Sequence, residues 1–447
     1  MTRLKHIWSD LRASFWFLPC LIVALAIVLA FTLTHFEESA LEQWMKRYPS
    51  LFGASAAGAR AMLSTIAGSM ISVVGIVFSM TLVALALASS QYSPRVLRTF
   101  MRSRVTQTSI GIFAGIFVYC LIVLRGVYGK DESVFVPVLA VTGAMLLAVV
   151  GVVVLIFFIH HIALSIQAST ILANIAEETV AAMQAMFPLP EDIREAEPGC
   201  SAAEADAHLT TLCWTHIPAP RSGYLQSIDY TALLQHACDA QRILRVERAV
   251  GEFVLEGTPM FSLAGDGEAQ LEGALHAAVT VSPYRTVEQD PGFGVRQLVD
   301  VALKALSPGV NDTTTAVMCL DYLSAVMATM GRLAIPSPYR FEKGALKLVA
   351  AGPDYAEMLG EAFDQIRRAA GGNVAVILRM IAVIGTLAAL VDDEERRADL
   401  KAQLDAIAEL GARTVEAPQD SAAIARALAP VRRALSFPLP QRQGLAS

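Results

Sequence analysis

Residues 61–104 read AMLSTIAGSMISVVGIVFSMTLVALALASSQYSPRVLRTFMRSR, and this stretch decides the fold. Its part from residue 61 to residue 88 carries no charged side chain. At a rise of about 1.5 Å per residue, that part is about 42 Å long as a helix, whereas the hydrocarbon core of a bilayer is about 30 Å thick. The stretch therefore predicts a membrane-spanning helix that tilts or extends beyond the bilayer.

Small and hydroxyl-bearing residues recur along this predicted helix at steps of three and four, which places them on one face. They are Ser64, Gly68, Ser72, Gly75 and Ser79. Two interpretations stay open. Such spacing is common where membrane helices pack closely in a bundle, and the same face can line a pore in a homo-oligomer, where hydroxyl groups meet water and ions. The face is uncharged, which argues against a proton relay.

The apolar stretch ends abruptly in Ser89, Ser90 and Gln91, and arginines follow it, among them Arg95 and Arg98. Basic residues gather on the cytoplasmic side of membrane helices, next to anionic lipid. We interpret this segment as the cytoplasmic boundary of the helix. Anchoring to lipid is the simpler role for the arginines, and an anion-attracting pore vestibule is the alternative.

Three further apolar runs are long enough to span a bilayer, and they predict membrane helices at residues 15–36, 106–124 and 134–159. Lys and Arg are more numerous at the N-terminus and after the second helix than on the opposite side, which predicts that both termini are cytoplasmic. Neither glycine nor proline lies between Gly151 and Pro188. The fourth helix is therefore predicted to continue beyond the membrane as one rod.

The composition fits a membrane part followed by an ordinary globular part. Of the 447 residues, 54% are hydrophobic and 17% are charged, whereas about 25% are charged in typical soluble proteins. The net charge of −6 gives no support to nucleic-acid binding. The 6 cysteines form no CxxC pair, so neither a zinc site nor a disulfide framework is indicated.

The predicted fold class is a membrane α-helical protein with four transmembrane helices and a mixed α/β cytoplasmic domain. Short β-forming runs separated by turn residues predict strands at residues 212–217, 223–228, 243–248, 252–255, 260–263 and 274–282. The predicted parts are a transmembrane domain (1–164), a helical extension with an acidic linker at 188–207 (165–209), a β-rich subdomain (210–285), a mainly helical subdomain (286–437) and a disordered tail (438–447).

Two segments of the predicted cytoplasmic domain allow more than one interpretation. Residues 251–261, GEFVLEGTPMF, resemble the turn-strand-turn of a barrel-sandwich hybrid, the fold of lipoyl and biotinyl domains. Carrier domains of that type need a modifiable lysine, and none lies between Gly223 and Gly265, so the resemblance implies a scaffold. Residues 374–390 are apolar but contain Arg379, so a buried core helix is favoured over a fifth membrane span.

Residues 288–316, EQDPGFGVRQLVDVALKALSPGVNDTTTA, are the nearest approach to a functional signature. Ser307-Pro-Gly ends one predicted helix, and Asn311 or Asp312 can cap the next, so a structural corner explains these residues. The alternative is a ligand or ion site, because oxygens and free backbone N–H groups gather at that helix start. The candidate site residues are Asp290, Arg296, Asp300, Asn311, Asp312 and Thr313.

This motif and residues 69–101, SMISVVGIVFSMTLVALALASSQYSPRVLRTFM, together resemble a bacterial family of predicted membrane proteins known as domain of unknown function 2254. The resemblance covers almost the whole chain. It implies the membrane topology and location in the bacterial cytoplasmic membrane, and it implies no activity.

Motifs of known catalytic sites are missing from the sequence, which contains no GxSxG, phosphate-binding loop or HExxH. We therefore expect neither an enzyme nor a bound cofactor or metal. Our hypothesis is a homo-oligomeric ion channel or permeation pathway that is lined by the second helix and regulated by the cytoplasmic domain. The alternative is a membrane-anchored ligand-binding, sensor or scaffold protein without transport. The expected partners are the bilayer, further copies of the chain, and ions or a small ligand.

Overall fold

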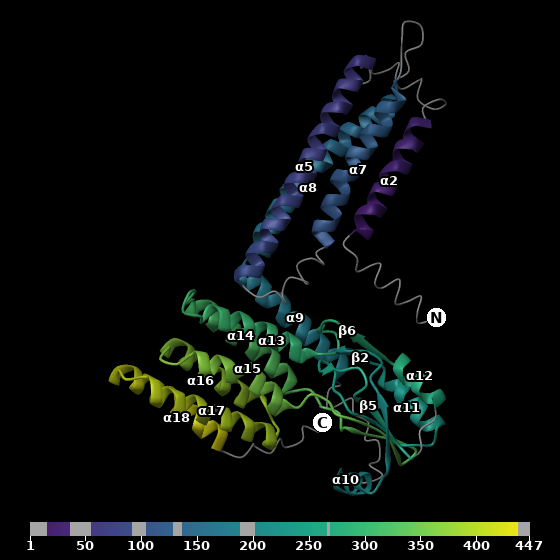
Figure 1. Ribbon diagram of the computed structural model, residues 1–447. Coiled ribbons are helices and arrows are strands. Elements are labelled where there is room, and N and C mark those ends of the chain that lie inside the picture. The colour runs from purple at the N-terminus through teal and green to yellow at the C-terminus, as the bar shows by residue number, and fades with distance from the viewer. Residues whose placement is uncertain are drawn as a thin grey trace, which may run out of the picture. The chain divides into compact units, whose positions relative to one another are not determined.

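The computed structural model describes residues 16–35, 55–91, 104–127, 136–187, 202–265 and 269–436 (Figure 1). The chain divides into two compact units, residues Met1–Thr170 and Ile171–Ser447. The predicted tail at residues 438–447 lies outside the described residues.

The N-terminal unit contains four long apolar helices, as the sequence predicts. They are α2 (Phe17–His35), α5 (Ala56–Gln91), α7 (Arg104–Gly126) and α8 (Val138–Ser165). By length and composition each is a candidate membrane span. Every one lies within a few residues of its predicted position, because an uninterrupted apolar run of this length is the strongest signal that a sequence carries.

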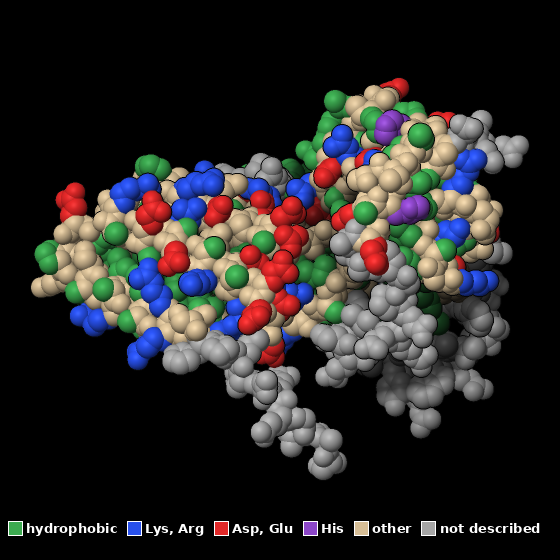
Figure 2. Space-filling view, turned by 90° about the horizontal axis from the view of Figure 1, so that it is seen from below, with side chains coloured by type: hydrophobic (Ala, Val, Ile, Leu, Met, Phe, Trp, Pro, Cys, Tyr) green, Lys and Arg blue, Asp and Glu red, His purple; other side chains and the backbone are tan. Residues whose placement is uncertain are grey.

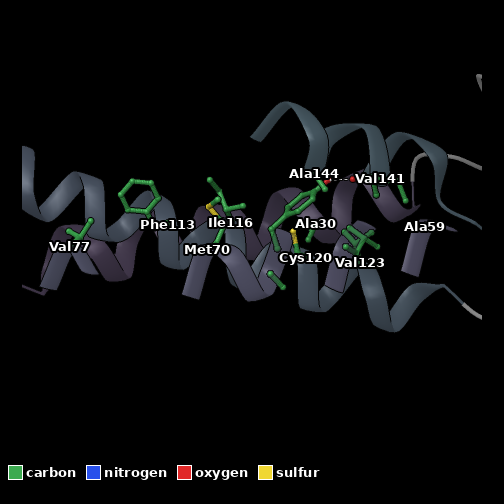
Figure 3. Close-up of a cluster of buried hydrophobic side chains, with 14 of the residues drawn as sticks. Ala30, Ala59, Met70, Val77, Phe113, Ile116, Cys120, Val123, Val141 and Ala144 are labelled. Carbon is green, nitrogen blue, oxygen red and sulfur yellow. Dashed lines mark hydrogen bonds between the residues drawn. The ribbon is translucent and has the colours of Figure 1, made fainter. Parts of the chain in front are cut away.

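Helix α7 is the centre of this bundle, since it packs against α2, α5 and α8. Half of its apolar span is buried, a larger share than in the other three. Its inward side chains form much of the core in Figure 3, and Tyr119 donates a hydrogen bond of 2.8 Å to the carbonyl of Ala140 in α8. Gly111 lets α2 approach closely, because a Cβ there would lie 2.9 Å from the Cα of Pro19.

The predicted single rod beyond the fourth helix is wrong. Helix α8 ends at Ser165, and a separate helix, α9 (Ala168–Met186), begins after a two-residue break. The hydroxyl of Ser165 donates to the carbonyl of His161 at 2.7 Å. Serine side chains that bond the carbonyl four residues earlier often bend helices, and this break therefore needs neither glycine nor proline.

The β part of the C-terminal unit contains two sheets. The first is five-stranded with the order β1-β5-β3-β8-β7, in which only β3 and β8 pair in parallel, and the second is three-stranded with the order β4-β2-β6. The strands are β1 (Trp214–Pro218), β2 (Gly223–Ile228), β3 (Leu244–Val246), β4 (Phe253–Val254), β5 (Pro259–Ala264), β6 (Val279–Ser282), β7 (Tyr339–Glu342) and β8 (Ala345–Ala350). The first five confirm the predicted strands.

Two predictions in this unit are wrong, and one hairpin was not predicted. Residues 274–282 form the end of α12 (Ala269–Ala277) and then the short strand β6, because Ala, Leu and Glu before β6 are good helix formers. The end of the predicted linker belongs to α10 (Ala202–Thr210), another alanine-rich helix; residues 188–201 lie outside the described residues. The hairpin of β7 and β8 was not predicted.

The remaining helices form the helical part of the C-terminal unit. They are α11 (Tyr230–Asp239), α13 (Pro291–Ala305), α14 (Thr313–Met330), α15 (Tyr355–Ala369), α16 (Val374–Leu390), α17 (Glu394–Thr414) and α18 (Pro418–Ser436). Helix α16 packs against α14, α17 and α18 and buries much of its apolar surface, which confirms the core-helix interpretation of residues 374–390. The mixed α/β region and the helical C-terminus are as predicted, and the barrel-sandwich hybrid stays a prediction.

Candidate functional site

The small-residue face of α5, defined by Ser64, Gly68, Ser72, Gly75 and Ser79, is exposed along its whole length in the N-terminal unit. A Cβ built at Gly68 or Gly75 would meet no atom of the described residues within 4 Å. The buried side of α5 is instead formed by Leu63, Ala67, Met70, Val77 and Ala84. At about 100° per residue, that side lies nearly opposite the small-residue face. The bundle of one chain therefore packs without this face.

Hydroxyl groups on the exposed part of α5 donate to the backbone of their own helix. Ser72 donates to the carbonyl of Gly68 at 2.9 Å, and Thr65 and Ser69 make the same kind of bond one turn back. A hydroxyl that donates in this way keeps its oxygen lone pairs as acceptors. The exposed surface of α5 thus offers oxygen acceptors along an otherwise apolar helix.

The predicted cytoplasmic boundary is described only in part. Ser89, Ser90 and Gln91 belong to the last turn of α5. Arg95 and Arg98 lie outside the described residues, so the role of the arginines stays a prediction.

Asp290 caps the N-terminus of α13, where its Oδ1 accepts from the backbone N–H of Phe293 at 3.1 Å. The side chain is buried and forms a two-bond ion pair with Arg285, at 2.7 Å and 3.0 Å. The guanidinium of Arg285 also lies over the ring of Phe293, 5.3 Å from its centroid. These contacts fix one end of the 288–316 motif.

The other end of the motif is the turn between α13 and α14. Asn311 has a positive φ of 47°, and Asp312 caps α14 by accepting from the backbone N–H of Thr315 at 3.0 Å. The hydroxyl of Thr315 donates to the same carboxylate at 2.6 Å, and Thr313 accepts from the side-chain amide of Asn373 at 2.9 Å. These are the contacts of a helix-turn-helix corner.

The six candidate residues of this motif lie in separate places. Asp290 and Asp312 are at opposite ends of α13, whose 15 residues span about 22 Å at 1.5 Å per residue. Between them, Arg296 forms an ion pair with Glu361 of α15, and Asp300 lies one turn further along α13. A single ligand cannot contact both ends, so the candidate residues divide into a corner and the neighbourhood of Asp290.

We expect Asp312→Ala to destabilise the C-terminal unit by about 1 kcal/mol near neutral pH, the usual loss when a helix cap is removed. The hydroxyl of Thr315, and then its backbone N–H, hold the pKa of Asp312 below its ordinary value. A lowered folded-state pKa stabilises above the unfolded pKa of about 3.9, and this contribution is lost as the pH falls through the folded value. The difference in unfolding free energy between wild type and variant should therefore shrink in acid, as urea titrations at several pH values would show.

A cleft beside Asp290 was not predicted from the sequence. It has a volume of about 340 Å³ and lies within the C-terminal unit. Its charged lining residues are Glu252, Arg285, Asp290, Asp354, Glu357 and Glu361, and its apolar walls include Met186, Tyr230 and Met358. The segments that line it are far apart in the sequence. Of these segments, only residues 288–316 had been predicted from the sequence to hold a candidate site.

Four candidate membrane spans, followed by a mixed α/β unit without a recognisable catalytic motif, define the class of a multi-span membrane protein of unknown function. The chain belongs to the predicted membrane protein family DUF2254, whose profile matches residues 12–386. It is 30% identical over 437 residues to the uncharacterised proteins Rv1290c of Mycobacterium tuberculosis and Mb1321c of Mycobacterium bovis. These alignments cover 96% of this chain and 82% of each relative. No solved structure gave a significant match.

Proposed function

We propose that the protein forms a homo-oligomeric permeation pathway in the bacterial cytoplasmic membrane, lined by α5 and regulated by the C-terminal unit. The observation that carries the proposal is the exposure of the small-residue face, nearly opposite the side on which α5 packs in its own bundle. A face of small and polar residues gains little free energy from contact with lipid tails. Around an axis shared by several copies, the same face can contact water and ions.

The borders of the small-residue face support assembly through α5. Helical spacing places exposed Ile71 and Phe78 on one side of the face and exposed Ile76 and Val83 on the other. Large apolar side chains on both borders can pack against neighbouring copies or lipid, while the Ser and Gly positions between them leave room. Ser72 adds an oxygen acceptor on the face itself, and Thr65 and Ser69 add acceptors along its Ile76 and Val83 border. Such an arrangement suits ions or small polar solutes.

The proposed sidedness, with both termini and the C-terminal unit in the cytoplasm, rests on the distribution of Lys and Arg in the sequence. The proposal includes no enzymatic activity, no cofactor and no nucleic-acid partner. We leave out enzymatic activity because the sequence lacks catalytic motifs, and nucleic acid because the net charge is −6.

Flux through liposomes tests the pathway. We expect purified wild-type protein to conduct ions, and we expect Gly75→Trp to reduce the flux by at least about tenfold, because a bulky ring would fill a pore of this kind. Leu146→Trp is the matched control, since Leu146 is 65% exposed on α8, outside α5. Wild-type protein without flux at any pH, salt or membrane tension, or equal flux in both variants, would contradict the proposal.

A second candidate function is a membrane-anchored ligand-binding or sensor protein whose helices only anchor and oligomerise. The observation that favours it is the cleft in the C-terminal unit. A scaffold of the barrel-sandwich type would suit this role. Ligand binding by a protein that supports no ion flux is the result that would favour this function over the pathway.

A further inference from the structure

The cleft beside Asp290 is built from five separate segments of the C-terminal unit. The end of α9 contributes Met186, the start of α11 contributes Tyr230, and the turns at 249–252, 285–292 and 351–354 complete it together with the first turns of α15. Its volume of about 340 Å³ is at the lower end of the range for pockets that hold small organic molecules.

The floor of the cleft is fixed before any ligand enters. Arg285 is held by its two hydrogen bonds to Asp290 and by the ring of Phe293. Gly251 has a φ of +93°, and a Cβ at this position would overlap the carboxylate of Asp290 and lie 3.0 Å from Nη2 of Arg285. Only glycine fits both the backbone conformation and the space. The backbone at residue 251 therefore packs directly against the Arg285–Asp290 ion pair.

The charge of the cleft is negative after its internal ion pairs are counted. Arg285 neutralises Asp290, Arg296 neutralises Glu361, and Arg248 lies 3.7 Å from the carboxylate of Glu252. Asp354 and Glu357 have neither a hydrogen bond nor an ion pair from their side chains among the described residues. Asp and Glu side chains also gather in a band on the face shown in Figure 2.

The acidic surroundings extend beyond the cleft to the start of α17. Burial raises the pKa of Asp399, and the nearby charges of Asp354, Glu395 and Asp393 raise it further. A carboxyl whose pKa is raised by its neighbours reports a negative local potential. Together with Asp354 and Glu357 in the lining, these carboxylates favour a cation at this end of the cleft.

The arrangement of the carboxylates selects the kind of cation. No group of three or more His, Cys, Asp or Glu among the described residues is placed to hold one metal ion. The carboxylates are instead spread along a cleft whose walls include Met186, Tyr230, Met358, Pro291 and Pro353. Methylene groups can lie against such walls while charged amino groups reach separate carboxylates.

We propose that this cleft binds a linear organic polyamine. One ammonium group pairs with Asp354 and Glu357, and the methylene chain lies along the apolar walls. A second ammonium group reaches Glu252, whose carboxylate it shares with Arg248. The inference does not depend on a pore in the membrane unit, because it concerns binding alone.

Calorimetry on the full-length protein in detergent tests the proposal, with spermidine, putrescine, butylamine and Mg²⁺ as probes. We expect spermidine to bind most tightly and butylamine, with one amino group, most weakly. Glu357→Gln and Asp354→Asn should each weaken spermidine binding by about tenfold, as expected for the loss of one charge-assisted hydrogen bond. Glu409→Gln removes the same charge from an exposed position outside the cleft, and spermidine should bind this control like wild type.

Thermal unfolding of each variant separates lost binding from lost folding. Because Glu357 is exposed, we expect Glu357→Gln to fold like wild type. Three results would overturn the proposal: no binding of spermidine to the wild type, equal weakening in Glu357→Gln and Glu409→Gln, or Mg²⁺ binding that depends on Glu357 while spermidine binding does not. None of these results bears on ion flux, so the cleft and the pathway fail or succeed separately.

Discussion

Gly294→Ala is expected to destabilise the C-terminal unit by about 3 kcal/mol, the upper part of the usual cost of overpacking a core. Gly294 lies on α13 where α9 crosses it, and a Cβ there would overlap Oγ1 of Thr179 and lie 2.9 Å from its Cβ and Cγ2. Thr179 is fully buried and its hydroxyl donates to the carbonyl of Ile175. It has no open space to turn into, so α9 must move away from α13.

Two further variants make this prediction specific. Gly309→Ala adds the same methyl group where no atom of the described residues lies within 4 Å, and it should leave the unfolding midpoint in urea nearly unchanged. Adding Thr179→Ala to Gly294→Ala removes the overlapping hydroxyl and should restore part of the lost stability. If Gly294→Ala and Gly309→Ala unfold at the same urea concentration, the close contact between α9 and α13 is wrong.

The four apolar helices could be predicted because their signal is local. A run of about 20 apolar residues needs no tertiary contact to be recognised, since the bilayer itself selects for it. The caps of the C-terminal helices are local in the same way. Asp290, Asp312 and Asn373 each accept from a backbone N–H three residues later, and of these caps the sequence predicted that of Asp312.

The features that the sequence did not predict depend on contacts between distant segments. Strand β8 pairs with β3, about a hundred residues earlier, and turns at residues 251 and 352 meet at the cleft beside Asp290. The residues of these strands and turns do not by themselves predict which distant segments they contact. The break between α8 and α9 is local, but a serine in a helix often bonds the same carbonyl without ending the helix, so Ser165 was not informative.

The side of α5 that packs in the bundle could also be identified only from the structure. Both sides of this helix are apolar or small, so hydropathy could not separate the side that packs from the side that stays exposed. The small residues allowed either close packing or a pore, and in the structure Leu63, Met70 and Val77 fill the bundle while Gly68 and Gly75 face outward. The small-residue face thus remains available to another copy of the chain, which is the basis of the proposed pathway.

A matched pair of glycine substitutions in the membrane unit should give the largest contrast. Gly111→Leu is expected to cost at least about 3 kcal/mol, because even its Cβ would lie 2.8 Å from Cδ1 of Ile22 and 2.9 Å from the Cα of Pro19. The backbone of α2 cannot rotate aside as a side chain can, so α2 must separate from α7. Unfolding of the monomer in detergent by increasing SDS would measure this loss.

Gly75→Leu adds the same side chain where one chain offers open space, and the monomer should therefore unfold like wild type. If the small-residue face lines a pore around a shared axis, the same variant should leave the oligomer intact and reduce its ion flux. A weaker oligomer, seen by crosslinking at several protein-to-detergent ratios, would mean that the face instead joins copies by close packing. Loss of monomer stability comparable to that of Gly111→Leu would mean that the face is buried within one chain. An unchanged monomer, an unchanged oligomer and an unchanged ion flux would mean that α5 faces only lipid, and a pathway lined by α5 would then have no basis.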